Sequence, residues 1–268
     1  MNYTPLKEIE STGLAYCGFT SDGRGQWHYN EPADRENYES LAALMDSDAA
    51  HFVRVRQQHT DHLLAVTAET AGEGVIRPAG TMVHKCEGDV CRFEFIEDGS
   101  GRDGCVTNMP GLVLGIVTAD CVPVLMLDPV NRAVAAVHSG WKGTALEISA
   151  KAALLMSELY GTSPEDLIVA LGPYICGKCY EVGSEVRAEF AGAYDSNELA
   201  SFFAPSANKG KFLLDMGSAI RLSLLKLGVK PENFHDSHHC TFTDESLYSW
   251  RRTHSKEERN ISVISLKQ

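Results

Sequence analysis

Three apolar runs rich in β-branched residues lie close together in the middle of the chain and constrain the fold most. They are LVLGIVT at 112–118, VPVLMLD at 122–128 and AVAAVH at 133–138. Short apolar runs bounded by turn residues are typical of strands that are buried on both faces. The segment PVN at 129–131 lies between the second run and the third, so we expect these two runs to form an antiparallel hairpin.

A helical pattern and further strands follow. The stretch ALEISAKAALLMSELYG comes after Gly143 and Thr144, which open the helix, and ends at the stop signal Gly161. Its apolar residues at helical spacing are Leu146, Ala150, Ala153, Leu154 and Leu159. We also expect strands at 167–172 and 261–266 and helices near 183–194 and 216–227. The hairpin needs antiparallel pairing, whereas a strand–helix–strand unit over 133–172 favours a parallel crossover. We therefore predict a mixed α/β fold with a mixed sheet.

The chain shows no internal repeat, low-complexity tract or linker, and we interpret residues 1–268 as one domain. Residues 85–110 are rich in Gly, Asp and Cys around one alternating stretch, Cys91–Ile96. This composition favours a hairpin and a loop over a core strand, and we interpret the segment as an insertion.

Charge and composition narrow the range of partners. A formal net charge of -12 disfavours nucleic acid, because phosphate backbones are bound mainly by clustered Lys and Arg. The sequence lacks an apolar run of about 18 residues, and its start, MNYTPLKEIE, does not resemble a secretion signal. We therefore expect a cytoplasmic protein that does not bind a membrane. Eight cysteines in 268 residues are too few for a disulfide scaffold, which predicts free thiols or metal ligands.

Cys121 and His138 are the strongest candidates for a functional site. A tight turn centred in the segment 129–130 pairs Asp128 with Asn131 and therefore Cys121 with His138. Directly opposed Cβ atoms lie about 5 Å apart, close enough for a thiolate and an imidazole to share one metal ion. A thiolate with imidazoles suits zinc, and three protein ligands leave an open fourth position, as in catalytic zinc sites. The pattern predicts a mononuclear, catalytic metal site.

The residues alone leave the third ligand and the chemistry open. His59 follows the strand-like segment FVRV in a polar turn, and His62 is its competitor. Cys121 could instead be a small buried residue, or the nucleophile of a cysteine hydrolase with His138 as base and Asp120 as the residue that orients it. Neighbouring residues of a strand point to opposite faces, which weighs against Asp120 in that role.

Five motifs occur in the order that is typical of one protein family. They are Gln57-Gln58-His59, Ala119-Asp120-Cys121-Val122-Pro123, Ala136-Val137-His138-Ser139-Gly140-Trp141-Lys142-Gly143, Gly172-Pro173 with Cys179-Tyr180-Glu181-Val182, and Ser249-Trp250-Arg251-Arg252. Through these motifs, over roughly residues 50 to 268, the chain resembles the family described as laccase-like polyphenol oxidoreductases or purine nucleoside phosphorylases.

The resemblance implies a mixed α/β sandwich with zinc on His59, Cys121 and His138, which decides against His62. It also implies phosphorolysis of adenosine, inosine, guanosine and methylthioadenosine, together with deamination of adenosine. Purine nucleosides and phosphate are then the expected partners of a monomer or homodimer, and Cys121, His138 and Asp120 are the catalytic candidates. The candidate phosphate donors are Lys142, Arg251, Arg252 and Arg24.

The chain departs from the family pattern in two places. The N-terminal family motif reads Phe19-Thr20-Ser21-Asp22-Gly23-Arg24-Gly25 here, with Asp22 where the family has an Arg. The late family motif Thr-Gly-Arg reads Glu257-Glu258-Arg259. Arg24 stands two places after the position of the family's Arg, so the resemblance does not by itself assign phosphate contacts to this loop, and the late motif keeps only Arg259.

Alternatives to the zinc enzyme remain. A copper-dependent polyphenol oxidase of the multicopper type typically needs several His-x-His pairs, whereas this chain has only the adjacent pair His238-His239, although copper could occupy the single site. A zinc ion that only braces the fold is another possibility. Cys176 and Cys179 lack a second pair at zinc-finger spacing, which favours a loop with incidental thiols. We interpret the run that contains His235, His238 and His239 as solvated surface.

Overall fold

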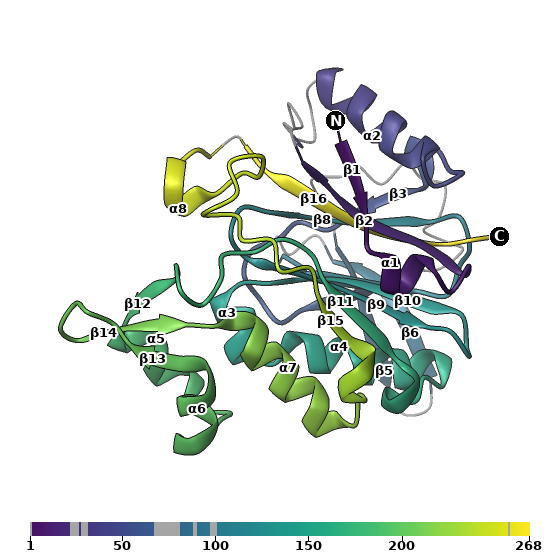
Figure 1. Cartoon of the computed structure of the whole chain (residues 1–268). Coiled ribbons are helices and arrows are strands. Elements are labelled where there is room, and N and C mark those ends of the chain that lie inside the picture. The colour runs from purple at the N-terminus through teal and green to yellow at the C-terminus, as the bar shows by residue number, and fades with distance from the viewer. Residues whose placement is uncertain are drawn as a thin grey trace.

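Two β-sheets packed face to face form the centre of the computed structural model, and helices cover their outer faces (Figure 1). The structure describes residues 2–21, 27, 32–66, 81–87, 90–96, 101–256 and 258–268. The first sheet contains, in spatial order, β1 (Asn2–Pro5), β2 (Ala15–Ser21), β16 (Asn260–Leu266), β8 (Val113–Thr118) and β3 (Phe52–Arg54). The second contains, in spatial order, β15 (Phe234–Asp236), β11 (Ile168–Leu171), β9 (Val122–Asp128), β10 (Ala133–Ser139), β7 (Gly104–Thr107) and β4 (Leu63–Ala65).

Both sheets are mixed. In the first sheet β3 is parallel to β8, and in the second sheet β4 is parallel to β7 and β11 is parallel to β15. The other neighbours are antiparallel. β10 and β11 both run antiparallel to β9, which lies between them, so they are parallel to each other and are joined through α4 (Ile148–Tyr160). This crossover and the mixed sheets confirm the predicted fold class.

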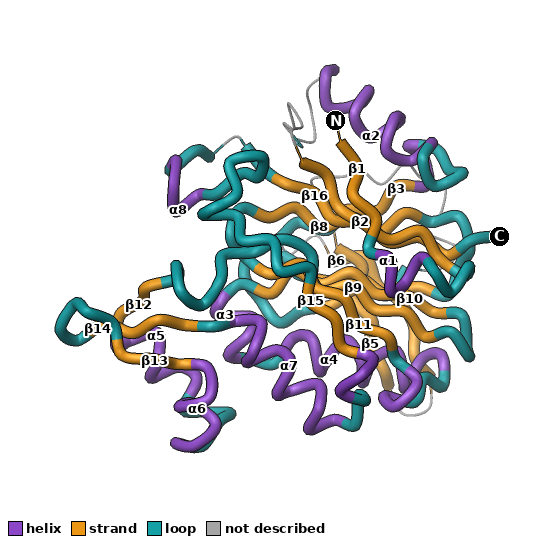
Figure 2. The backbone as a smooth tube through the Cα atoms, in the orientation of Figure 1, coloured by secondary structure: helices purple, strands orange, loops and turns teal. Residues whose placement is uncertain are grey.

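Helices lie on the outer faces of the two sheets (Figure 2). α2 (Pro32–Ala43) covers the five-stranded sheet, and α3 (Trp141–Ala145), α4 and α7 (Met216–Leu227) cover the six-stranded sheet. The other helices are α1 (Lys7–Glu10), α5 (Ser184–Phe190), α6 (Ser196–Phe202) and α8 (Trp250–Thr253). Two small sheets consist of β12 (Glu181–Gly183), β14 (Lys211–Leu214) and β13 (Phe203–Pro205), and of β5 (Thr81–Glu87) and β6 (Val90–Ile96). Within the described ranges, no helix is both long and apolar enough to cross a membrane.

The continuous apolar runs are strands buried on both faces. In β9, Val124 and Met126 belong to the core beneath the helices, while Leu125 and Leu127 belong to the core between the sheets. Strand residues point alternately to the two faces, so a strand between two cores has few polar positions. The predicted strands at 112–118, 122–128, 133–138, 167–172 and 261–266 are confirmed as β8, β9, β10, β11 and β16, and the predicted helices near 183–194 and 216–227 as α5 and α7.

The register of the β9–β10 hairpin differs from the prediction by two residues. Asp128 lies opposite Ala133, not Asn131, and His138 lies opposite Pro123, not Cys121. The turn is longer than predicted because the Asp128 carboxylate accepts hydrogen bonds from the backbone N–H groups of residues 130 and 131, and Arg132 closes the turn with a φ of 52°. A shift of two residues keeps every side chain on the same face of the sheet.

The predicted helix over 143–161 is two helices. The left-handed backbone of Glu147, with φ 57°, separates α3 from α4 and changes the phase of the buried face. Leu146 and Leu154, which the single-helix pattern placed on the apolar face, are 48% and 51% exposed, whereas Ile148, Ala152 and Met156 are buried. The stop at Gly161 is confirmed, since it ends α4 with φ 75°.

Part of the segment 85–110 lies in the core, contrary to the prediction. The expected hairpin is present as β5 and β6, which pair Cys86 with Cys91. However, β7 joins the six-stranded sheet between β10 and β4, and its Cys105 and Val106 are fully buried. The strand is only four residues long and follows Gly101, Arg102 and Asp103, so its sequence has too little apolar length to stand out.

Candidate metal centre

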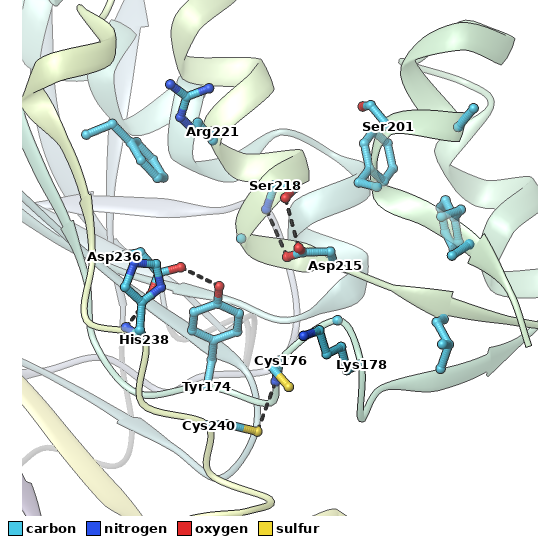
Figure 3. A pocket seen from close by; sticks show the side chains of 18 residues that line it. Tyr174, Cys176, Lys178, Ser201, Asp215, Ser218, Arg221, Asp236, His238 and Cys240 are labelled. Atoms are coloured by element: carbon cyan, nitrogen blue, oxygen red, sulfur yellow. Dashed lines mark hydrogen bonds and ion pairs between the residues drawn. The ribbon is translucent and has the colours of Figure 1, made fainter.

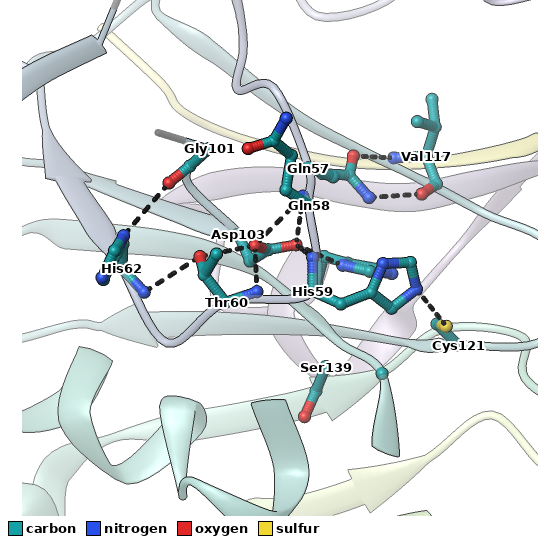
Figure 4. A network of polar contacts seen from close by, with 12 residues as sticks. Gln57, Gln58, His59, Thr60, His62, Gly101, Asp103, Val117, Cys121 and Ser139 are labelled. Carbon is teal, nitrogen blue, oxygen red and sulfur yellow. Dashed lines mark hydrogen bonds and ion pairs between the residues drawn. The ribbon is translucent and has the colours of Figure 1, made fainter. Parts of the chain in front are cut away.

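Three side chains that are far apart in the sequence meet where β9 begins and β10 ends. His59 comes from the loop between β3 and β4, Cys121 directly precedes β9, and His138 is near the end of β10. The three potential ligand atoms lie within 4.8 Å of one another. The Sγ atom of Cys121 lies 3.8 Å from Nε2 of His59 (Figure 4). The ring centroids of His59 and His138 are 4.9 Å apart. The two-residue shift of the hairpin thus leaves Cys121 and His138 neighbours on one face.

His59, not His62, belongs to this group. The Nδ1 atom of His62 lies 3.3 Å from the carbonyl oxygen of Gly101 and 3.1 Å from the guanidinium of Arg102 (Figure 4). The choice between the two histidines, which the residues alone left open, is therefore decided by the path of the loop.

The donor set fits a zinc ion. Bonds of about 2.3 Å to sulfur and about 2.0 Å to nitrogen place two donors of a tetrahedral site roughly 3.5 Å apart, close to the observed separation of 3.8 Å between Cys121 and His59. One thiolate and two imidazoles leave a fourth position for a substrate or water, and the same borderline-soft ligands also bind copper.

Asp103 organises two of the three ligands. Its buried carboxylate accepts a hydrogen bond of 2.7 Å from Nδ1 of His138, which leaves Nε2 of that ring available to a metal. The same carboxylate accepts hydrogen bonds from the backbone N–H groups of Gln58, His59 and Thr60 and from the Thr60 hydroxyl (Figure 4). These bonds hold the turn in which His59 has a left-handed φ of 60°.

Gly140 leaves the space that the ligands occupy. A Cβ atom at this position would lie 2.7 Å from Cδ2 of His59 and 3.1 Å from Sγ of Cys121. Gly140 lies directly beyond Ser139, the last residue of β10, and is the residue before α3. The site therefore needs a residue without a side chain here, although the backbone conformation does not require glycine.

We expect Gly140→Ala to weaken zinc binding at this site by tenfold or more, because the methyl group displaces His59, and misplaced metal ligands cost about that much affinity. Competition with a chromophoric chelator measures the affinity. Gly192→Ala is the matched control, since its Cβ would meet nothing closer than 3.6 Å. Equal losses of zinc affinity in both variants would show that the close contact at Gly140 does not cause the loss.

Cys121, His138 and Asp103 shift one another's pKa values. Burial raises the pKa of the Cys121 thiol, but the charge of His138 and hydrogen bonds with both histidines outweigh it and lower the pKa to about 6. Burial lowers the pKa of His138, but the Cys121 thiolate and the bond to Asp103 raise it to about 9. Burial also raises the pKa of Asp103, whereas its bonds with His138 and Thr60 bring it to about 2. Without a metal, the site therefore holds a thiolate, an imidazolium and a carboxylate at neutral pH.

We expect zinc binding to release about one proton between pH 6 and pH 9. In this range the pKa of about 6 leaves Cys121 ionised, whereas the pKa of about 9 keeps a proton on His138 that a metal must displace. The association constant should therefore rise about tenfold per pH unit and level off above pH 9. Calorimetric titration in buffers of different ionisation enthalpy counts the proton, with His59→Ala as baseline. A constant independent of pH in this range would contradict the expected imidazolium.

A cavity of about 520 Å³ opens onto the three ligands. Its wall contains four arginines and three large aromatic side chains, which are Arg54, Arg56, Arg251, Arg259, Trp141, Tyr180 and Trp250. The guanidinium of Arg251 lies 5.0 Å over the Tyr180 ring and donates to the carbonyl oxygen of Glu181. Cationic groups beside flat rings suit a ligand that combines an anion with an aromatic ring system.

Asp120 lines the cavity, and its carboxylate is hydrogen-bonded to Thr241 and Arg251. Its carboxylate accepts hydrogen bonds of 2.6 Å from the Thr241 hydroxyl and from the backbone N–H of Arg251, and its φ is 96°. Asp120 thus ties the loop before β9 to the first turn of α8 and places Arg251 in the cavity wall. Asp103, not Asp120, is the carboxylate that orients His138.

The four candidate phosphate donors differ in their position relative to the cavity. Arg251 lies in the cavity wall. Lys142 is exposed, does not line the cavity, and has its Nζ atom 5.5 Å from the Trp141 ring. Arg252 is also outside the wall and donates to the carbonyl oxygens of Thr241, Phe242, Asp244 and Leu247. Arg24 lies outside the described residues.

Asp103 and the arginines at positions 54 and 56 were not found from the sequence. Asp103 lies in the segment Gly101-Arg102-Asp103-Gly104, which reads as a polar turn, and only the pairing of β7 with β10 brings it to His138. Arg54 belongs to β3 and is buried. A charged residue in an otherwise apolar strand was the one available signal for Arg54.

The fold and the site define a mixed α/β sandwich protein in which a His-Cys-His group that could hold a metal ion lines a cavity rich in arginine. The chain belongs to the family described as multi-copper polyphenol oxidoreductase laccase, whose model matches residues 28–267.

Three known proteins illustrate the relationship. The chain is 30% identical over 258 residues to the purine nucleoside phosphorylase YlmD of Bacillus subtilis, and the alignment covers 96% of this chain and 86% of that protein. It is 35% identical over 165 residues to the adenosine deaminase RL5 of an unknown prokaryotic organism, over 61% of this chain and 62% of that protein. The crystal structure of the hypothetical protein YfiH of Bacillus licheniformis superposes with a TM-score of 0.82 at 26% identity, over 99% of this chain and 96% of that chain.

Proposed function

We propose that this protein is a zinc-dependent purine nucleoside phosphorylase that acts on adenosine, inosine, guanosine and methylthioadenosine and also deaminates adenosine. The observation that carries the proposal is the His59–Cys121–His138 group, whose open side faces a cavity lined by arginines and aromatic rings. The names of the relatives, purine nucleoside phosphorylase and adenosine deaminase, support the same class of substrate.

The cavity has the size and the chemistry that a nucleoside and a phosphate need. Its volume of about 520 Å³ lies within the range of small-molecule sites. Tyr180, Trp141 and Trp250 offer flat faces for a purine ring. Arg251 and the other wall arginines can bind phosphate oxygens in pairs through their planar donor groups.

The residues of the site have distinct tasks. A zinc ion on His59, Cys121 and His138 would supply a Lewis acid beside the substrate. Asp103 keeps the proton of His138 on Nδ1 and so directs Nε2 toward the cavity. Asp120 holds Arg251 in the wall through its backbone N–H, and Arg251 neutralises the charge of the bound phosphate.

Chromatography of products tests the proposal. The purified full-length protein, loaded with zinc, is incubated with the four nucleosides with and without phosphate. We expect free base and ribose 1-phosphate (or its methylthio analogue) only when phosphate is present, and inosine from adenosine without it. The absence of both kinds of product, with zinc bound at the site, would overturn the proposal.

We expect Arg251→Ala to raise the KM for phosphate by tenfold or more, because a charge-assisted hydrogen bond contributes about 1.5–3 kcal/mol and 1.4 kcal/mol corresponds to a factor of ten. Lys142→Ala is the matched control and should leave this KM unchanged, since Lys142 lies outside the cavity wall. Initial rates at varied phosphate concentration measure both constants. If only Lys142→Ala raised the KM for phosphate, the phosphate would have to bind at the start of α3 and not beside Arg251.

A cysteine hydrolase is the second candidate, because Cys121, His138 and Asp103 are linked in series as a thiolate, an imidazolium and a carboxylate. Activity that resists chelators but is lost on alkylation would favour this hydrolase. The family description raises a third activity, phenol oxidation with copper. Oxygen consumption with a phenol, dependent on several copper ions per chain, would favour the oxidase.

A further inference from the structure

A second group of sulfur atoms lies apart from the metal centre. Cys176 and Cys179 belong to the loop between β11 and β12, and Cys240 follows β15 more than sixty residues later. The three Sγ atoms lie within 4.8 Å of one another. The Cys-x-x-Cys pair, whose sequence indicated incidental loop thiols, therefore has a third thiol beside it. None of the three belongs to the His59–Cys121–His138 group.

The backbone holds the three cysteines in place. The N–H groups of Cys179 and Tyr180 both donate to the carbonyl oxygen of Cys176, which folds the pair into a tight turn. Tyr174 forms a parallel β-bridge with Cys240, and the N–H of Cys176 donates to Sγ of Cys240 at 3.3 Å (Figure 3). Main-chain hydrogen bonds thus bring the thiols together from two separate segments.

The arrangement fits a thiophilic metal ion. The sulfur atoms of a tetrahedral zinc site lie roughly 3.8 Å apart when the bonds are about 2.3 Å long, so small side-chain rotations would suffice from separations below 4.8 Å. Three thiolates select zinc over hard cations such as magnesium and calcium. A divalent cation also removes the mutual repulsion of three thiolates in a partly buried place.

We propose that Cys176, Cys179 and Cys240 form a second zinc site with an open fourth position. No fourth His, Cys, Asp or Glu joins the group among the residues that the structure describes. Cys176 and Cys240 line a cavity of about 750 Å³, whose wall also contains Lys178, Asp215 and His238 (Figure 3). The fourth ligand is water or an anion that enters through this cavity, with Lys178 in its wall.

This second site would stabilise the position of Asp120, which lies next to Cys121 of the first group. The N–H of Ile175, next to Cys176, donates to the carbonyl oxygen of Asp120, and the hydroxyl of Thr241, next to Cys240, donates to the Asp120 carboxylate. A zinc ion between the two cysteine segments would therefore fix Ile175 and Thr241, two of the hydrogen-bond partners of Asp120, the residue that precedes Cys121. The role is one of positioning and involves no contact with the nucleoside cavity.

Zinc counting tests the proposal independently of any nucleoside activity. The full-length protein is reduced, stripped, reloaded with zinc and desalted, and its metal is measured by mass spectrometry. We expect two zinc ions per chain in the natural protein, one in Cys121→Ala, and one in the double variant Cys176→Ser/Cys240→Ser. Cys17→Ala, which changes a buried thiol outside both groups, is the matched control and should keep two.

Cobalt spectra of Cys121→Ala give a second measurement that leaves the three cysteines intact. In this variant an intense thiolate-to-cobalt charge-transfer band, with the visible bands of tetrahedral cobalt, is expected to come from the cysteine site alone. A double variant that binds as much zinc as the natural protein, or a cobalt-loaded Cys121→Ala without this band, would overturn the proposal. A disulfide between two of these cysteines in the protein as isolated without reductant, seen as a loss of two hydrogens in its mass, would also overturn it.

Discussion

Replacing Cys121 by alanine is expected to remove the metal from the His59–Cys121–His138 group and to reduce nucleoside turnover to background. The thiolate is one of three ligands, and the two imidazoles that remain cannot complete a zinc site alone. A metal ion that acts as a Lewis acid contributes several kcal/mol, and 1.36 kcal/mol corresponds to a factor of ten in rate. We therefore expect kcat/KM to fall by about three orders of magnitude or more.

The zinc content and the rate are measured on the same Cys121→Ala preparation. Cys17→Ala is the control, because Cys17 is also a thiol but is fully buried in the core between the sheets. It should retain both metal and activity. A Cys121→Ala protein that keeps its rate and its full zinc content would remove the basis of the proposed function. Loss of activity with the full zinc content of the natural protein would instead favour Cys121 as a nucleophile.

The proximity of Cys121 and His138 shows why part of the site could be predicted. The predicted register was wrong by two residues, because the Asp128 carboxylate caps a longer turn. The two side chains nevertheless lie close together, as predicted, since an even shift does not change the face to which a side chain points. A hairpin is local, and local pairing is the kind of contact that a sequence pattern specifies best.

The parts of the site that come from distant segments could not be predicted in this way. Nothing in the residues around Asp103 indicates that β7 lies beside β10, because β7 is short and follows a polar segment. The link between Cys240 and the Cys176–Cys179 turn is made by a β-bridge at Tyr174 and by a hydrogen bond from the N–H of Cys176 to Sγ of Cys240, which join segments more than sixty residues apart. The resemblance identified His59 as a ligand, but the reason for its position, a left-handed turn held by Asp103, is visible only in the structure.

The same reasoning explains which elements of the fold were predicted. The strands 122–128 and 133–138 were predicted correctly because burial between two cores makes all of their positions except Asp128 and His138 apolar. The helix over 143–161 was placed correctly as a whole, but its buried face was not. The left-handed residue Glu147 has no sequence signal of its own, since glutamate favours helices. Helical periodicity cannot be followed through such a break.

Asp103 is the residue whose replacement should most disturb both stability and metal binding. Its carboxylate is fully buried, binds His138 at 2.7 Å, and accepts the N–H groups of the His59 turn. Asp103→Ala would leave these donors without a partner, so we expect the free energy of unfolding to fall by about 3 kcal/mol. Urea denaturation measures it. Asp61→Asn, two residues after His59 on the surface, is the control and should cost less than about 1 kcal/mol.

Asp103→Asn separates the two roles of the carboxylate. The amide keeps the volume of the side chain but has no negative charge and only one oxygen, so His138 loses its charged partner. We expect zinc affinity at this site to fall about 10- to 100-fold in a protein that still folds, as is typical when the partner of a ligand histidine is changed. Zinc competition titrations give this value. If Asn kept full affinity, the role of Asp103 would be confined to holding the His59 turn.

The pH dependence of stability gives an independent check on Asp103. Hydrogen bonds with His138 and Thr60 outweigh burial and hold its pKa at about 2, below the value of about 3.9 in an unfolded chain. A lowered pKa stabilises the folded state above the unfolded value, and this contribution is lost as the pH falls through the folded value. The difference in unfolding free energy between the natural protein and Asp103→Ala should therefore be largest above about pH 4 and shrink between pH 4 and pH 2. A difference that stays constant over this range would mean that the charge of Asp103 does not contribute, and that the loss in the variant comes from packing alone.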